Sequence, residues 1–240
     1  IHNTHSNPRF FGRYKKLFCI SKAVKKHTAE QGFPDGIIIY NGIHTDQIVP
    51  KKDRVLSSGH ISRFVCVGRL HPDKGQRLII EAFNILVNQY GQSGFTVDII
   101  GDGKERSDLE NLTYQYGLGN FIRFLGSRPR SWIYPHLKDY DLYILTSISE
   151  GFGLTVAEAC AAKVPVLTCD LPGPMEVIDN GRLGMTFKTG DAKSLAEGIE
   201  NLLISNEDSF KIESAYEYVK KNFDVTMTTK MYIDNYYRIK

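Results

Sequence analysis

The chain has 240 residues, 42% of them hydrophobic and 24% charged, with a formal net charge of +3. These values are ordinary for a globular protein with a sizeable core, and the charge is too small to predict nucleic-acid binding. No apolar run approaches the ~20 residues that a membrane-spanning helix needs, and no signal-peptide pattern is visible.

Residues that often bind metals are scattered along the chain. His60, His71 and His136 lack ligand spacing, so no metal site is expected. The four cysteines, at positions 19, 66, 160 and 169, form no close C-x-x-C pair and lie in or beside apolar runs. They are interpreted as reduced core cysteines of a cytosolic protein.

The first forty residues predict one β–α–β unit, with strands at 17–20 and 37–40 around a helix near 22–31. Two strands and a helix are too few to form an independent core. Five basic residues fit a solvated helix face better than an anionic membrane surface: Lys15, Lys16, Lys22, Lys25 and Lys26. The polar stretch 41–60 predicts a linker.

From residue 61 onward, short β-rich runs alternate with helical patterns. Strands are predicted at 63–67, 95–100, 121–124, 142–145, 165–168 and 185–187, and helices at 78–90, 105–116, 155–162, 192–204, 212–223 and 225–239. This alternation predicts an α/β fold, a doubly wound parallel sheet with helices on both faces. Ligands bind such sheets beyond the carboxyl ends of the strands, where Gly68, Gly101, Gly126 and Ser147 fall.

The most informative stretch is 150–158, Glu-Gly-Phe-Gly-Leu-Thr-Val-Ala-Glu, between a predicted buried strand and a helix. Its two glycines let the backbone approach a ligand closely. The helix start presents unpaired N–H groups and the positive end of the helix dipole, which suits a phosphate. Glu150 and Glu158 are placed to reach hydroxyl groups on either side of that phosphate, so the pattern predicts a nucleotide-sugar site.

A second group of candidates follows the first strand of the predicted sheet. Gly68 and Arg69 end that strand, and Lys74 lies in a short turn that opens a helix. Arginine offers a planar fork for phosphate oxygens and lysine a movable charge, so both could stabilise a departing diphosphate without a metal. Alone, the two cations fit surface ion pairs better, but together with stretch 150–158 they favour ligand binding.

Three weaker patterns accompany these groups. The Gly-Asp-Gly turn at 101–103 fits a close approach to a base or ribose and a simple tight turn about equally well. The Asp-Tyr-Asp at 139–141 lies at a helix end and is interpreted as capping and turn chemistry, not as a metal site. Residues 172–176 predict a further cleft loop, in which Glu176 is interpreted as a cap in preference to a ligand contact.

The motifs, and the order in which they follow one another along the chain, resemble the donor-binding half of family 4 glycosyltransferases, which are retaining enzymes of the GT-B fold. The resemblance covers nearly the whole chain, through 67–75, 100–103, 124–126 and 147–158. The Glu-x7-Glu element with its inner Gly-Phe-Gly is specific, and the other pieces are weak alone but strong together. The resemblance implies a Rossmann-like GT-B C-terminal domain and a partial second Rossmann-like domain.

The resemblance also implies a role for each matching residue. Arg69 and Lys74 would contact the donor diphosphate and Glu150 would lie at the transferred sugar, which makes these three the catalytic candidates. Glu158 would hold the ribose hydroxyls, and Ser127 and Arg128 would lie against the base. The other donor-binding candidates are Gly68, Gly101, Gly103, Gly151, Phe152, Gly153, Leu154 and Thr155. Family members usually need no metal, so no cofactor is expected.

The family has two Rossmann-like domains, of which this chain would hold one and part of the other. Residues 1–40 would be a remnant of the acceptor-side domain, with a late strand of that domain at 1–6, and 41–60 the linker. Residues 61–222 would form the donor domain, and 223–240 a C-terminal helix that packs back toward the N-terminal part. Because the acceptor-side residues would lie upstream, we expect nucleotide binding with little turnover by this chain alone.

The implied activity is transfer of a sugar from a nucleotide-diphosphate sugar to a glycan or glycolipid hydroxyl with retention, in cell-envelope polysaccharide or lipopolysaccharide synthesis. UDP is the expected nucleotide, from the habits of the family. The implied location is cytoplasmic. The resemblance also allows peripheral contact with the inner face of the cell membrane, made through the missing N-terminal domain.

Two alternatives stay open, a sugar-nucleotide epimerase of the same fold and a non-catalytic nucleotide-sugar-binding subunit. An NAD-dependent enzyme is least favoured, because Arg106 stands where the dinucleotide fingerprint has its third glycine.

Overall fold

The computed structural model describes residues 16–33, 36–52, 61–204 and 211–237. Its strands are β1 (Phe18–Cys19), β2 (Ile37–Ile38), β3 (Arg63–Val67), β4 (Thr96–Ile100), β5 (Ile122–Gly126), β6 (Leu142–Leu145), β7 (Val166–Cys169) and β8 (Met185–Phe187). Its helices are α1 (Lys22–Glu30), α2 (Gln76–Asn84), α3 (Arg106–Gln115), α4 (Arg130–His136), α5 (Leu154–Ala161), α6 (Pro172–Val177), α7 (Ala192–Ile204), α8 (Ile212–Phe223) and α9 (Val225–Tyr237). The strand predicted at 1–6 and part of the predicted linker, 53–60, lie outside the described residues.

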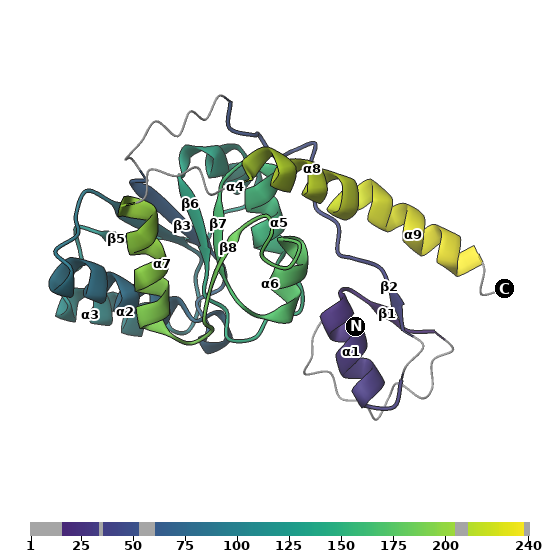
Figure 1. The fold of residues 1–240 in the computed structure, drawn as a ribbon, viewed down its shortest axis with the longest axis horizontal. Helices are drawn as coiled ribbons and strands as arrows, with labels where there is room; N and C mark the ends of the chain where they lie inside the picture. Colours follow the sequence, from purple (N-terminus) through teal and green to yellow (C-terminus); the bar gives the residue numbers. More distant parts are fainter. Residues whose placement is uncertain (1–15, 34–35, 53–60, 205–210, 238–240) are drawn as a thin grey trace.

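A six-stranded parallel sheet forms the centre of the molecule, in the order β5-β4-β3-β6-β7-β8. Strands β6 and β7 are buried along their whole length, which explains their continuous apolar sequences. Helix α2 packs beside α3 and α7, and α5 packs beside α6 and α8, so that helices flank the sheet on both sides (Figure 1). The predicted doubly wound α/β fold is confirmed.

The order of the strands reverses beside β3. The chain runs outward from β3 through β4 to β5, and then returns to add β6 on the other side of β3. In doubly wound sheets, the crevice at such a reversal, beyond the carboxyl ends of the strands, is where ligands bind. The segments that leave β3 and β6, 68–75 and 146–153, therefore meet at this point.

Most predicted elements match the structure within two residues, with two differences. Residues 172–176 form helix α6 and not a loop, because Pro172 at the first helical position has a suitable fixed φ and needs no amide partner. The helix predicted at 78–90 is interrupted, because α2 continues as a π-helical turn at Ile85–Gln89, closed by the hydrogen bond from Tyr90 N to Ile85 O.

The N-terminal unit, β1–α1–β2, is a parallel strand pair with one helix, and α9 runs beside it (Figure 1). The rings of Phe18 and Tyr232 lie 5.3 Å apart, and Thr228 Oγ1 donates to Tyr40 O over 3.0 Å. These contacts link the C-terminal helix to the start of the chain. None of the described helices has the length and apolar character that crossing a membrane requires.

Candidate functional site

An ion pair lies where the segments after β3 and β6 meet. Lys74 Nζ is 2.7 Å from Glu150 Oε2, and the two side chains are 30% and 18% exposed. Ser147 Oγ donates to the same carboxylate oxygen over 3.4 Å. The pair is thus partly buried yet still reachable from solvent, as a ligand-contacting pair must be.

The backbone holds this pair in place through a close approach of two loops. Asp73 O accepts a hydrogen bond of 2.8 Å from Ile148 N, and Thr146 Oγ1 donates to Lys74 O over 3.0 Å. Gly75 has φ +63°, and a Cβ atom there would lie 2.2 Å from Thr146 O. Only glycine therefore allows the start of α2 to lie against the end of β6.

The two glycines of the turn at 101–103 are also required by close packing within the protein, as Gly75 is. A Cβ atom at Gly101 would lie 1.9 Å from Gly68 O, and one at Gly103 would lie 2.2 Å from Leu70 O. Gly101 N also donates to Gly126 O over 2.9 Å. Tight packing of the carboxyl ends of β3, β4 and β5 thus accounts for these glycines, and their donor-binding role stays a prediction.

The stretch 150–153 forms the turn into α5. Gly153 precedes the helix with φ +105°, and a Cβ atom at Gly173 on α6 would lie 2.7 Å from Phe152 N. In the described part of the chain, the amides of Leu154 and Thr155 have no hydrogen-bond partner, as expected for a first helical turn. These two amides are open donors for an anion at the positive end of α5.

Phe152 contributes to the core and not to the cleft. Its side chain is 1% exposed, and its ring lies 5.7 Å from that of Tyr40 and 5.0 Å from that of Phe223. Only the backbone of Phe152 remains available for the predicted donor contact.

Glu158 is buried and is held through one carboxylate oxygen. Tyr134 donates to Oε1 over 3.0 Å, and Arg130 Nε lies 3.8 Å from the same atom. Burial raises the pKa of Glu158 above its usual value, and the tyrosine hydrogen bond and the arginine charge offset this only in part. No hydrogen bond within the described residues reaches Oε2, so that oxygen is an unused acceptor, and the ribose contact of Glu158 stays a prediction.

A second tyrosine ties α5 to the neighbouring strand. Tyr143 donates to Thr155 Oγ1 over 2.6 Å and lies 3.3 Å from Val67 O. This places the first turn of α5 beside the end of β3, where Gly68 begins. Burial raises the pKa of Tyr143, so it remains a neutral donor.

The structure does not bring every predicted residue to the ion pair. Arg69 is exposed, with its carbonyl oxygen accepting from Gln76 Nε2 over 3.0 Å, and among the described residues its side chain forms no hydrogen bond or ion pair with Lys74 or Glu150. Ser127 and Arg128 are exposed beyond β5, where the Arg128 guanidinium lies 5.5 Å from the Trp132 ring centre. These three assignments stay predictions.

Sequence reasoning missed the residues that support the site. Tyr134 and Arg130 lie four positions apart on one face of α4, a spacing visible in the sequence, but nothing local shows that this face meets Glu158. Tyr143 lies in an ordinary strand sequence, and Gly173 lies in the segment that was predicted to be a cleft loop and that forms α6 instead. Their roles follow from what packs against them.

Asp141 of the Asp-Tyr-Asp pattern has a structural role at the start of β3. Asp141 accepts hydrogen bonds from Ser62 N and Arg63 N, both of 3.1 Å, and pairs with Lys51 Nζ at 3.1 Å. Across residues 16–33, 36–52, 61–204 and 211–237, no group of three or more His, Cys, Asp and Glu side chains is placed to hold a metal ion.

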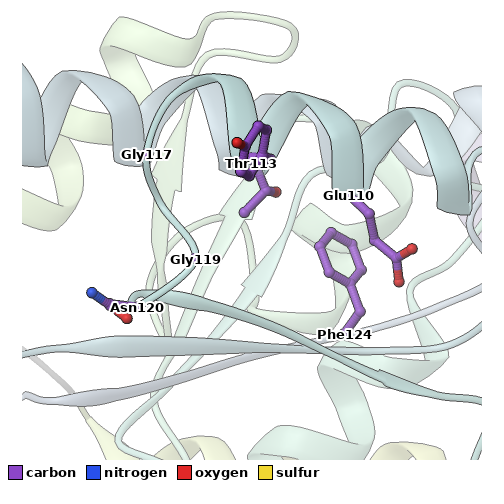
Figure 2. A pocket seen from close by; sticks show the side chains of 7 residues that line it. Glu110, Thr113, Gly117, Gly119, Asn120 and Phe124 are labelled. Carbon is purple, nitrogen blue, oxygen red and sulfur yellow. The ribbon is translucent and has the colours of Figure 1, made fainter.

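A cavity of about 290 Å³ lies elsewhere, between α3 and the edge strand β5. Figure 2 shows Glu110 and Thr113 on α3 facing Phe124 on β5, with Gly119 and Asn120 at the entrance to the strand. None of the predicted site residues lines it. The candidate site is therefore defined by its contacts at the strand ends and not by this cavity.

The order of the strands, together with the open start of α5 at the point where that order reverses, defines a Rossmann-like domain of the kind that binds nucleotides. The model of the family described as "Glycosyl transferases group 1" matches residues 51–221, and the chain belongs to this family.

Several curated proteins are similar to this chain along most of its length. An uncharacterized glycosyltransferase of Methanocaldococcus jannaschii is 28% identical over 89% of this chain and 58% of its own length. The lipopolysaccharide core biosynthesis glycosyltransferase of Rhizobium meliloti is 25% identical over 93% of this chain and 64% of its own length. The chain thus spans less than two thirds of either relative.

Solved structures share the fold. The Anabaena protein HepE, crystallised with UDP and glucose, superposes with a TM-score of 0.80 at 22% identity, covering 94% of this chain and 64% of the Anabaena chain. This likeness supports the GT-B architecture expected from the sequence.

Proposed function

We propose that this chain is the donor-binding part of a glycosyltransferase that moves a sugar from a UDP-sugar to a glycan or glycolipid hydroxyl with retention, in cell-envelope polysaccharide or lipopolysaccharide synthesis. The observation that carries the proposal is the Lys74–Glu150 ion pair of 2.7 Å, at the reversal of strand order and beside the open start of α5. The uridine nucleotide and the pathway are supported by the ligands of the Anabaena structure and the name of the Rhizobium relative.

In this proposal, the donor diphosphate lies between two sources of positive potential. One is the Lys74 ammonium group, and the other is the amide pair of Leu154 and Thr155 at the amino end of α5. Both would stabilise negative charge on the departing diphosphate, which is where charge develops as the bond to the sugar breaks. No metal is required for this stabilisation.

The two glutamates would bind the two ends of the donor. Glu158 would accept a hydrogen bond from a ribose hydroxyl through Oε2, because Oε1 is already held by Tyr134. Glu150, fixed by Lys74 and Ser147, would lie at the transferred sugar. We name the turn Glu150–Gly153 the donor turn.

A thermal-shift panel with UDP, GDP, ADP and their glucose conjugates tests the proposal. A ligand that binds only the folded chain adds about 2.7 kcal/mol of stability at a concentration of 100 Kd, which for a chain of this size raises Tm by roughly 5–11 °C. We expect this shift with UDP-glucose. If none of the six compounds raises Tm, the chain is not a nucleotide-sugar-binding protein and the proposal is wrong.

The chain offers a matched control for the role of Lys74. Lys163 Nζ lies 2.7 Å from Glu213 Oε2, the same length as the Lys74–Glu150 pair, and the Lys163 side chain is 25% exposed, close to the 30% of Lys74. Glu213 is 66% exposed, so the match holds for the lysine, and this pair lies away from the strand ends. Lys74→Gln should abolish most of the UDP-glucose shift, while Lys163→Gln should keep it. Equal losses in both variants would assign the effect to general destabilisation.

A further inference from the structure

The donor turn is held by residues far away in the chain. Ser21, at the start of α1, donates a hydrogen bond of 2.7 Å to Gly151 O and is itself fully buried. The same hydroxyl oxygen accepts from Val24 N over 3.0 Å, which caps α1. One side chain therefore both begins a helix of the N-terminal unit and holds a peptide of the donor turn.

A carboxylate on α6 fixes the position of α1 against the donor domain. Glu176 accepts from Lys22 N over 2.9 Å and from Ala23 N over 2.7 Å, so its two oxygens satisfy the first two amides of α1. Tyr40 also donates to Glu176, over 3.1 Å. The predicted cap role of Glu176 is confirmed, with the difference that the capped helix lies 153 positions away in the sequence.

The donor turn is enclosed from the other side as well. Gly173 on α6 lies so close that a Cβ atom there would be 2.7 Å from both Gly151 C and Phe152 N. The Phe152 ring packs with Tyr40 from the N-terminal unit and with Phe223 from α8. The turn therefore has little freedom to move unless α1 moves.

We propose that Ser21 is a positioning residue for donor binding, through which the β1–α1–β2 unit sets the orientation of the Gly151 peptide. This inference rests on the proposed function, because it assigns the donor turn to the diphosphate and sugar. A mobile turn would weaken the contacts of Glu150 and the start of α5 with those groups. It would leave the ribose contact of Glu158, further along α5, nearly unchanged.

The variants Ser21→Gly and Ser21→Thr separate this role from helix capping. Glycine is an acceptable cap residue but has no hydroxyl group to donate to Gly151 O, whereas threonine keeps both functions. The measurements are calorimetric affinities for UDP-glucose and UMP, and hydrogen exchange of the ligand-free chain in a peptide covering 146–158.

We expect Ser21→Gly to weaken UDP-glucose binding about tenfold, the effect of one buried hydrogen bond, with UMP affinity changed less than about twofold. Exchange in 146–158 should quicken, with no change in 76–84 of α2, and Ser21→Thr should behave as the wild type. Equal losses for both ligands, or unchanged exchange in 146–158, would overturn the inference.

Failure of the proposed function gives a different result. If the wild-type chain binds neither ligand, the proposed function is wrong, and the positioning role in donor binding falls with it. The exchange measurement on the ligand-free chain still shows whether Ser21 orders the turn. If the wild type binds UDP-glucose and Ser21→Gly leaves the ratio of the two affinities unchanged, only the present inference is wrong.

Discussion

Replacing Gly75 by alanine tests whether the close approach of α2 to β6 maintains the Lys74–Glu150 pair. A Cβ atom at Gly75 would lie 2.2 Å from Thr146 O and 3.2 Å from Thr146 C, where ordinary contact begins at 3.4 Å. The two loops must therefore separate by about 1 Å or more. That movement lies directly beside Lys74 and should lengthen the ion pair.

The cost of this substitution has two parts. Alanine in the left-handed region costs about 1–2 kcal/mol, and the forced separation adds about 1–3 kcal/mol, as for other overpacked sites. The free energy of unfolding should therefore fall by about 2–5 kcal/mol. Because each kcal/mol shifts Tm by ~2–4 °C in a chain of this size, we expect a drop of at least about 4 °C.

Gly117→Ala is the matched control. Gly117 has φ +67°, against +63° at Gly75, but a Cβ atom there would meet nothing within 4 Å. This control carries the backbone cost of about 1–2 kcal/mol alone. Urea unfolding followed by circular dichroism gives both free energies, and calorimetry gives the affinity for UDP-glucose. If Gly75→Ala destabilises no more than Gly117→Ala and binds UDP-glucose normally, the close approach is not what holds the pair.

Three further predictions concern Glu158, which is buried, and Asp141, which is partly buried. Tyr134→Phe removes the hydroxyl that holds Glu158, so calorimetry should show about tenfold weaker UDP binding with no change for 2′,3′-dideoxy-UDP. A similar loss for both nucleotides would contradict the ribose role. Because the pKa of Glu158 is raised above 4.5, the advantage of UDP over its dideoxy analogue should shrink as the pH falls through that raised pKa. Burial by itself would raise the pKa of Asp141. The hydrogen bonds from Ser62 N and Lys51 have the opposite and larger combined effect, so the pKa lies below its usual value of 3.8. Its stabilising effect is thus present above about pH 3.8 and lost below it, so acid unfolding of Asp141→Asn should depend less on pH in that range.

The sequence predicted the fold well because most of its signals are local. Strands β3, β6 and β8 match their predicted bounds residue for residue, since runs such as Leu-Tyr-Ile-Leu are apolar and end at turn-forming residues. The Glu-Gly-Phe-Gly turn predicted the helix start at Leu154 within one residue. Glycines that allow a tight turn, and an apolar run that follows, reveal such a junction without any distant contact.

Local signals were insufficient where neighbouring elements decide the conformation. Residues 172–176 read as a loop because they contain two prolines and a glycine, but Pro172 and Pro174 lie in the first turn of α6. The order of strands β5-β4-β3-β6-β7-β8 also follows from packing of the whole chain, and it is this order that places Lys74 beside Glu150.

By itself, the sequence determined the layered α/β fold, the turn into α5 and the two glutamates, because periodicity and turn chemistry act over a few residues. Only the tertiary structure decided that Tyr134 holds Glu158 and that Ser21 reaches Gly151 across 130 positions. A hydroxyl group on a helix has no local feature that indicates its partner. The partner is fixed when the helices dock on the sheet, because burial then requires each polar atom to find a hydrogen bond.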